Sequence, residues 1–169
     1  DTNNYTLFVN REDRARVAEL VPERFRIVTG ALRSRLTRLC FQQLALPVME
    51  SIHRLDVVHS PAFIAPLLKR RTRHVLTVHD MTFFSRPDVH TRMRASAGFR
   101  WAVETSIRTC DEVAVPSDHT KADLLRLLPG AVEASRIVVT RAGIHHRFGP
   151  ATRDQVEAVR RKYSLPEDF

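Results

Sequence analysis

The sequence lacks most of the features that identify the simplest functional classes. It contains only two cysteines, Cys40 and Cys110, which form neither a disulfide framework nor the paired ligands of a structural zinc site. No apolar run approaches the ~20 residues of a membrane-spanning helix. Neither Gly-x-Gly-x-x-Gly nor Gly-Lys-Ser/Thr is present, which excludes the common glycine-rich phosphate loops. Two free thiols fit a reducing cytoplasm, which is the predicted location.

Lysine is also scarce, because nearly all of the positive charge is arginine. The 169 residues carry 27 Lys and Arg against 19 Asp and Glu, a net charge of +8, yet only Lys69, Lys121 and Lys162 are lysines. Arginine binds phosphate and carboxylate groups through two parallel hydrogen bonds, so nucleotides, nucleic acids and acidic lipid headgroups all fit as partners. The alternative is a set of arginines spread over solvated surfaces. The hydrophobic fraction of 43% is ordinary for one globular domain.

Short apolar runs alternate with helical patterns along the chain. Strands are predicted at 5–9, 25–29, 56–61, 74–79, 112–116 and 136–140, and helices at 11–21, 34–55, 63–68, 90–110, 117–128 and 154–163. Pro47 should break or kink the second of these helices. Strands that alternate with helices predict an α/β domain with a parallel sheet and right-handed crossovers.

Three of the predicted strands end in small or polar residues. One strand runs into His79 and Asp80, the strand before it ends in His59 and Ser60, and Ser117 follows the next strand and opens a helix. Ligands bind outside the carboxyl ends of parallel strands, so these side chains should converge on one crevice. Each also has a structural interpretation: a packed histidine at 59 or 79, a turn residue at 80 and a helix N-cap at 117.

Other catalytic and metal-binding arrangements are not favoured. His145 and His146 are adjacent and point apart in most backbone geometries, and no cysteine or carboxylate follows at ligand spacing. A serine–histidine–aspartate triad would have to use Ser60 or Ser117 without a nucleophile elbow. We therefore predict no metal site and no triad.

Four segments together resemble a known family. Residues 56–61 (Asp-Val-Val-His-Ser-Pro), 75–80 (Val-Leu-Thr-Val-His-Asp), 111–124 and 137–150 are similar, in order and spacing, to the amino-terminal half of family 4 glycosyltransferases. The resemblance runs from about Tyr5 to the end of the chain. It implies a GT-B enzyme with two Rossmann-like domains, a parallel sheet flanked by helices in each, and transfer of a sugar from a nucleotide-sugar to an acceptor hydroxyl. Retention of configuration and independence of metals and other cofactors are implied as well.

The resemblance assigns roles to particular residues. His79 matches the family histidine that faces the cleft near the transferred sugar, and Asp80 follows in the same loop, so both are predicted to be catalytic. Gly143 lies in a segment that matches the family's interdomain connection, whose usual sequence is Asn-Gly-Val-Asp. In this chain Ala142 replaces the Asn and His145 replaces the Asp. Substrate-binding roles are predicted for His59, Ser60, Ser117 and Gly143.

The family pattern also sets the expected domain limits. Residues 1–150 would form the acceptor-side domain without the family's first strand, and residues 151–169 the linker helix and the start of the donor-binding domain. The nucleotide-sugar would bind through that second domain, and the acceptor would be a glycan, a lipid or a small molecule. The arginine-rich stretch 33–38, followed by Leu39, Cys40 and Phe41, suits either an anionic membrane surface at the inner face of the membrane or a solvated helix face.

A free-standing binding module is the alternative function. A basic α/β domain can hold nucleic acid or another polyanion, and arginines occur at positions 11, 14, 16, 33, 35 and 38. No aromatic residues alternate with them to stack on bases, so nucleic acid is the less favoured partner. Steeply salt-dependent binding to unrelated duplexes would support this alternative.

The expected domain limits generate a first prediction. A sheet that lacks a central strand exposes apolar edges, so the purified 169-residue chain should be poorly soluble and should not turn over a nucleotide-sugar. Nucleotide release from a panel of nucleotide-sugars measures this directly. Detectable turnover by this chain would contradict the prediction.

Overall fold

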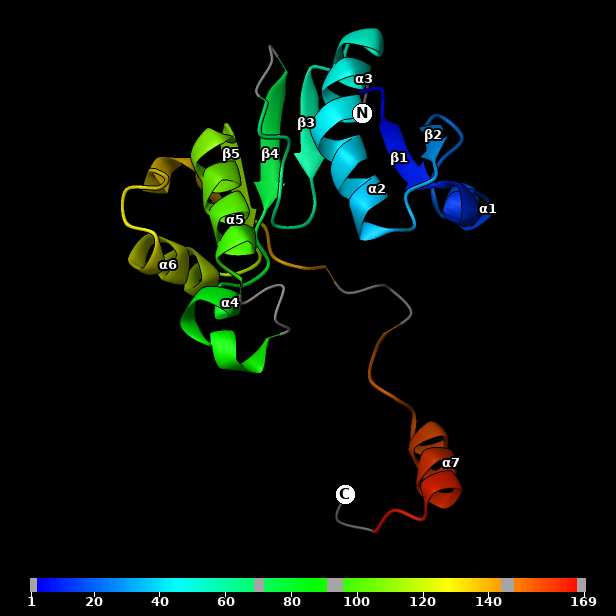
Figure 1. The fold of residues 1–169 in the computed structure, drawn as a ribbon. Helices are drawn as coiled ribbons and strands as arrows, with labels where there is room; N and C mark the ends of the chain where they lie inside the picture. Colours follow the sequence, from blue (N-terminus) through cyan, green and yellow to red (C-terminus); the bar gives the residue numbers. More distant parts are fainter. Residues whose placement is uncertain (1–2, 69–71, 91–95, 144–147, 167–169) are drawn as a thin grey trace.

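The structure, a computed structural model, describes residues 3–68, 72–90, 96–143 and 148–166 (Figure 1). Its strands are β1 (Thr6–Asn10), β2 (Arg26–Gly30), β3 (Val57–Ser60), β4 (Arg73–Thr77), β5 (Glu112–Val115) and β6 (Ile137–Val139). Its α-helices are α1 (Arg14–Leu20), α2 (Arg35–Cys40), α3 (Leu46–Ile52), α4 (Thr82–Ser85), α5 (Ala97–Thr109), α6 (Asp118–Leu127) and α7 (Arg153–Tyr163). Short 3-10 turns are η1 (Arg11–Asp13), η3 (Pro87–Val89) and η4 (Ala134–Arg136), and η2 (Phe41–Ala45) is a π-helical turn. The predicted α/β class is confirmed.

The strands form two parallel sheets. β1 pairs with β2, and β3, β4, β5 and β6 follow one another in that order in the second sheet. In Figure 1, α2 and α3 lie in front of the strands on one side of the molecule and α5 lies in front of β5. The Rossmann-like parallel arrangement agrees with the prediction, whereas the division into two sheets was not predicted.

The core joins buried residues of the four-stranded sheet to buried residues of α4, α5 and α6. Leu76 and Val113, which are register partners on β4 and β5, are fully buried. They belong to the same buried cluster as Val103 and Ile107, which lie four residues apart on one face of α5. Both strands of this pair are apolar and rich in β-branched residues, as buried parallel strands are. The core therefore fixes the positions at which β4 and β5 end.

The helical segment 35–52 is continuous through Pro47, so of the two predicted alternatives, a break or a kink, the break is not observed. Ser34 caps its amino end by accepting the Thr37 N–H at 3.0 Å. The π-helical turn η2 ends directly before α3, in which Pro47 is the second residue. A proline at the start of a helix needs no N–H donor, so the change from π to α geometry accommodates it.

Two other boundaries differ from prediction. Residues 63–68 are irregular rather than helical, because Phe63 has a left-handed backbone (φ 53°) and Pro66 interrupts any helical turn. α5 begins at Ala97, capped by Ser96, and the predicted start near 90 falls partly on residues outside the described ones. None of the described helices is long and apolar enough to cross a lipid bilayer.

Glu50 of α3 and His74 of β4 are buried in contact with each other. Glu50 is 1% exposed and His74 of β4 is 2% exposed, and His74 Nε2 lies 3.2 Å from Glu50 Oε1. The contact has the length of an ion pair but not the angle of a good hydrogen bond, and neither carboxylate oxygen has another partner in the described part of the chain. The backbone around His74 is held separately, since its N–H donates to Asp111 Oδ2 at 2.8 Å. Glu50 therefore depends on His74 for compensation of its charge.

This dependence predicts an asymmetric effect of substitutions. His74→Leu should lower the free energy of unfolding by about 3 kcal/mol, because it leaves the Glu50 carboxylate buried without a partner. The double variant Glu50→Met/His74→Leu should recover most of that loss, since no buried charge remains. Urea denaturation measures both, with His119→Leu at a solvent-exposed position as the control. A His74→Leu protein as stable as the parent would rule out the pair as a stability determinant.

Candidate functional site

The three strands with polar endings are neighbours, as predicted. β3 pairs with β4 and β4 pairs with β5, all in parallel, so their carboxyl ends meet at one edge of the sheet. β4 ends at Thr77, and His79 and Asp80 lie in the loop that follows it. His59 lies within β3, and Ser117 lies two residues after β5. The candidate site is built on this edge.

His79 is exposed and its ring is held from two sides. Nε2 lies 2.8 Å from the carbonyl oxygen of Pro61, and the edge of the ring contacts Phe63, with centroids 5.8 Å apart. A carbonyl oxygen only accepts hydrogen bonds, so Nε2 carries the hydrogen. In the neutral ring Nδ1 is then an acceptor. The ring is thus prepared to accept a hydrogen bond from a hydroxyl group.

The partners of His79 lie on the loop after β3, which is tied to other elements. The Phe63 N–H donates to the Thr77 carbonyl at 3.0 Å, so this loop follows the end of β4. Phe63 also packs against Phe83 and Phe99 with its ring edge-on. The left-handed backbone of Phe63 costs about 1 kcal/mol, which these contacts offset. Strain of this kind at a loop beside an exposed histidine is typical of functional sites.

Two glutamines of the π-helical turn hold the far side of that loop. Gln43 Nε2 donates to the Ala65 carbonyl at 3.0 Å, and Gln43 Oε1 accepts the Leu67 N–H at 2.9 Å. Gln42 Nε2 donates to the Ile64 carbonyl. The sequence reasoning missed these residues, and their only signal was a pair of amides on a largely apolar helix.

His59 and Ser60 point to opposite faces of the sheet. His59 is exposed, and its Nε2 lies 2.8 Å from Thr77 Oγ1 on the neighbouring strand. Ser60 is only 5% exposed and lies on the buried face with its register partner Leu76. Alternation along a strand separates the two, so only His59 of this pair is accessible to a ligand.

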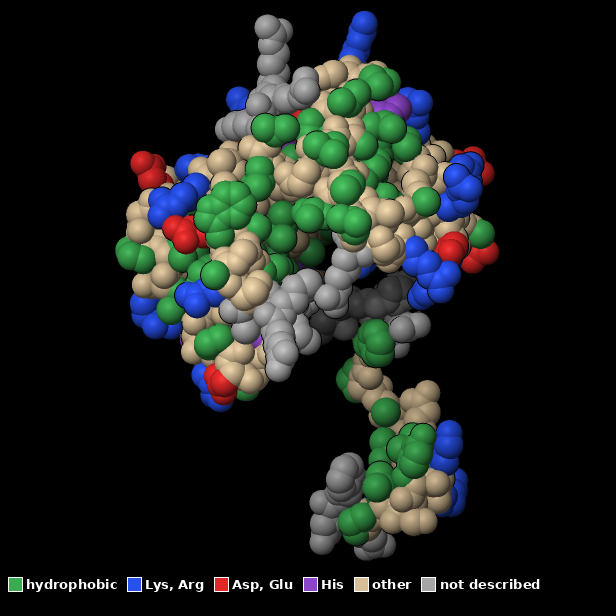
Figure 2. Space-filling view, viewed as in Figure 1, with side chains coloured by type: hydrophobic (Ala, Val, Ile, Leu, Met, Phe, Trp, Pro, Cys, Tyr) green, Lys and Arg blue, Asp and Glu red, His purple; other side chains and the backbone are tan. Residues whose placement is uncertain are grey.

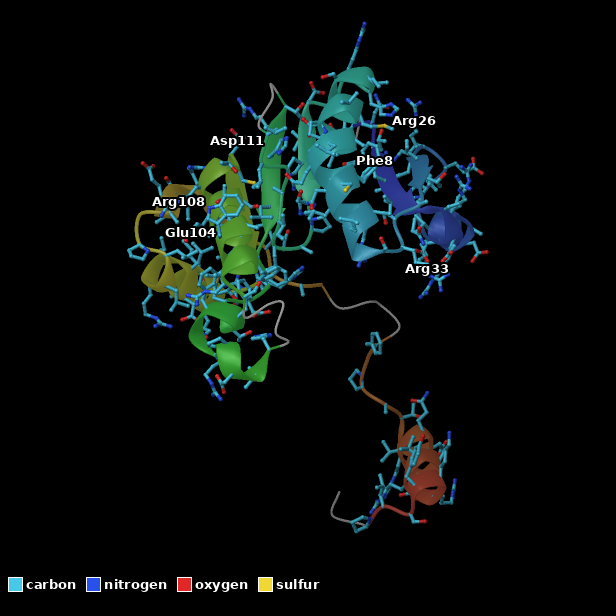
Figure 3. All side chains as sticks on the ribbon, viewed as in Figure 1. Phe8, Arg26, Arg33, Glu104, Arg108 and Asp111 are labelled. Atoms are coloured by element: carbon cyan, nitrogen blue, oxygen red, sulfur yellow. The ribbon has the colours of Figure 1, made fainter. Side chains whose placement is uncertain are left out.

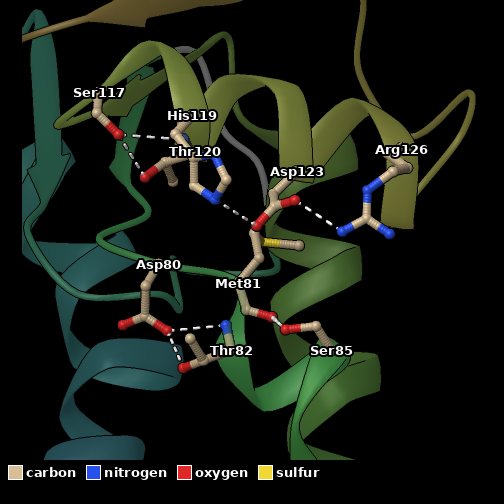
Figure 4. A network of polar contacts seen from close by, with 9 residues as sticks. All are labelled: Asp80, Met81, Thr82, Ser85, Ser117, His119, Thr120, Asp123 and Arg126. Carbon is tan, nitrogen blue, oxygen red and sulfur yellow. Dashed lines mark hydrogen bonds and ion pairs between the residues drawn. The ribbon is translucent and has the colours of Figure 1, made fainter.

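Asp80 acts as the turn residue at the start of α4. Its Oδ1 accepts hydrogen bonds from both the N–H and the hydroxyl of Thr82 (Figure 4). The same hydroxyl lies 2.8 Å from His90 Nε2. The contacts of Asp80 are therefore those of a turn residue, and its catalytic role stays a prediction.

Ser117 caps α6. Its Oγ accepts the Thr120 N–H at 3.1 Å and lies 3.0 Å from Thr120 Oγ1 (Figure 4). Further along the helix, the Arg126 guanidinium donates to Asp123 Oδ1 at 2.7 Å and holds the pKa of that carboxyl below its usual value. The hydroxyl of Ser117 is thus used within the fold, and binding of an anion at this helix end stays a prediction.

The remaining predicted residues give little support to a site. Gly143 is exposed, and a Cβ added there would meet no atom within 4 Å, so its backbone could accept other residues. His145 and His146 lie outside the described residues. Among the residues that the structure describes, no group of three or more His, Cys, Asp and Glu side chains is arranged to hold a metal ion.

Comparison with known protein families identifies a match. The family model described as Glycosyltransferase Family 4 matches residues 3–148, which include both sheets and every predicted site residue. A search of the curated proteins found no match.

The connection between η2 and the loop after β3 generates a prediction. Gln43→Leu removes both hydrogen bonds of this side chain and should speed hydrogen exchange of the Leu67 amide roughly tenfold. Gln155→Leu on α7 is the matched control, since Gln155 bonds only within its own capping box. Exchange mass spectrometry of the 61–67 peptides reads the effect. Unchanged protection in Gln43→Leu would show that other contacts hold the loop.

Proposed function

The chain belongs to glycosyltransferase family 4, and on that premise we propose that it is the acceptor-side domain of a retaining, GT-B sugar transferase. The donor is a nucleotide-sugar bound mainly by a second Rossmann-like domain, and the acceptor is a hydroxyl group of a glycan, a lipid or a small molecule. No metal ion or other cofactor takes part. The observation that carries this proposal is the fixed, exposed ring of His79 at the carboxyl end of β4.

His79 is proposed to position the reacting sugar. Its Nε2–H is engaged by the Pro61 carbonyl, so Nδ1 remains to accept a hydrogen bond from a hydroxyl of the donor sugar or the acceptor. The ring contact with Phe63 limits rotation of the imidazole. A hydrogen-bond acceptor that is fixed in the protein aligns the sugar when it binds. The chemical step is then faster, because less entropy has to be lost in reaching the transition state.

The chemical step then requires little covalent participation from this chain. The acceptor oxygen forms a bond to the anomeric carbon while the bond to the nucleotide phosphate breaks. The departing phosphate oxygen takes the electron pair and then the proton of the acceptor hydroxyl. Charge therefore develops on the phosphate, and its stabilisation is assigned to the donor-side domain. The net charge of +8 assists by raising the local concentration of the anionic donor.

Substitution of His79 tests the proposal in an enzyme that contains both domains. His79→Ala should lower kcat by about 100-fold, because the sugar hydroxyl loses its acceptor, and should leave the melting temperature nearly unchanged, because the ring is exposed. His119→Ala is the matched control, since this exposed histidine on α6 bonds only to Asp123. Transfer from radiolabelled nucleotide-sugars measures both. Full activity of His79→Ala would remove His79 from the site.

A further inference from the structure

The helical segment 35–52 presents an apolar surface to solvent. Leu36, Leu44 and Ile52 are 70%, 66% and 67% exposed, and Val48 is 48% exposed. These four side chains are called the α2–α3 apolar face below. The inward side of the same segment carries different residues. Phe41 contacts Phe8 of β1, which is labelled in Figure 3, and Glu50 is buried against His74 of β4. The apolar face is therefore not part of the core.

The π-helical turn keeps this face together. In a regular α-helix residues four positions apart are offset by about 40°, so a row at every fourth position would wind around the helix. A π turn holds more residues per turn and takes back part of that offset. η2 contains Leu44 and separates Leu36 from Val48, where this correction is needed. Figure 2 shows the result as hydrophobic side chains gathered over α2 and α3 in the middle of one face.

The exposed charged residues of the segment 33–52 are all basic. The only acidic residue in the segment 35–52 is Glu50, which is buried. Arg38 is exposed and makes no side-chain ion pair within the described part of the chain, and Arg33 is 84% exposed with only the exposed Glu12 beside it. Both arginines lie at the amino end of the helix, where the helix dipole is also positive. This end of the face attracts anions.

We propose that the α2–α3 apolar face and its arginines dock on an anionic membrane surface. Helices that lie in the membrane interface combine an apolar row that enters the acyl boundary with arginines that contact lipid phosphates. At 1.5 Å per residue the segment is about 27 Å long, so its whole length can lie along the surface. A second copy of the chain is the less suitable occupant, because it would bring two chains of net charge +8 and the same arginines together.

A tryptophan on the neighbouring helix supports the orientation and supplies a reporter. Trp101 of α5 is 62% exposed, and hydrophobic side chains over α5 appear on the same face as those over α2 and α3 (Figure 2). Tryptophan prefers the interface between lipid and water. It is also the only tryptophan of the chain, so intrinsic fluorescence reports its environment alone.

Vesicle flotation of the 169-residue chain tests the proposal, and flotation separates bound protein from any aggregate. The chain should float with vesicles of equal phosphatidylcholine and phosphatidylglycerol but not with phosphatidylcholine alone, and the emission of Trp101 should shift to the blue. Leu44→Ser/Val48→Ser should reduce the partition coefficient about tenfold or more. Leu20→Ser/Val89→Ser, at positions that are 75% and 62% exposed outside the face, should leave it within about twofold.

Charge reversal gives a second test that does not depend on the apolar side chains. Arg38→Glu should lower partitioning about tenfold. Arg153→Glu makes the same exchange at an exposed position in the first turn of α7, outside the face, and should have little effect. An acid near the amino end of a helix stabilises it, so lost binding by Arg38→Glu is not a sign of unfolding.

Three outcomes would overturn the proposal. They are equal binding to neutral and anionic vesicles, full binding by Leu44→Ser/Val48→Ser, and a lipid-free dimer in sedimentation that this double variant dissociates. The last result would make a second copy the occupant. None of these measurements involves sugar transfer, so membrane docking and the proposed function can fail independently.

Discussion

The hydrogen bonds between η2 and the loop after β3 are the constraint on which the candidate site depends. Gln43 forms hydrogen bonds with two backbone groups of that loop, at Ala65 and Leu67. These bonds join the helical segment 35–52 to the loop that carries Pro61 and Phe63. Pro61 and Phe63 in turn hold the ring of His79. The same π-helical turn thus sets both the inward contacts of the segment 35–52 and its outward apolar face.

The site has a rigid side and an adjustable side. β4 and β5 are anchored by the fully buried pair Leu76 and Val113, so the position of the residues after these strands is fixed by the core. The loop after β3 joins that core at the buried Ala65, whereas the part that carries Pro61 is held by hydrogen bonds and by the aromatic contacts of Phe63. Differences in loop stability of this kind are usual where a site must admit a substrate.

Most of the fold could be predicted because its strands are short apolar runs rich in β-branched residues, whose boundaries fell within two residues of the prediction at both β4 and β5. The helical turn predicted at 63–68 is wrong, because the left-handed backbone at Phe63 and the proline at 66 prevent it. The continuity of the helix through Pro47 depends on a π-helical turn whose glutamines bond a distant loop, and no local pattern encodes that.

His79 was placed correctly at the strand end, but its partner is a backbone carbonyl, which has no sequence signature. For Asp80 and Ser117 the structural interpretations, a turn and a cap, describe what these side chains do.

Main-chain atoms make the decisive contacts around His79, and this has an evolutionary consequence. The histidine is oriented by a carbonyl, and Gln43 recognises a carbonyl and an amide, so neither contact requires a particular side chain at Ala62, Ile64 or Leu67. Those positions can therefore diverge without disturbing the imidazole. In the proposed function, side chains of this short loop would contact the substrate while its main-chain atoms orient His79, so selection could change the first set of contacts and keep the second.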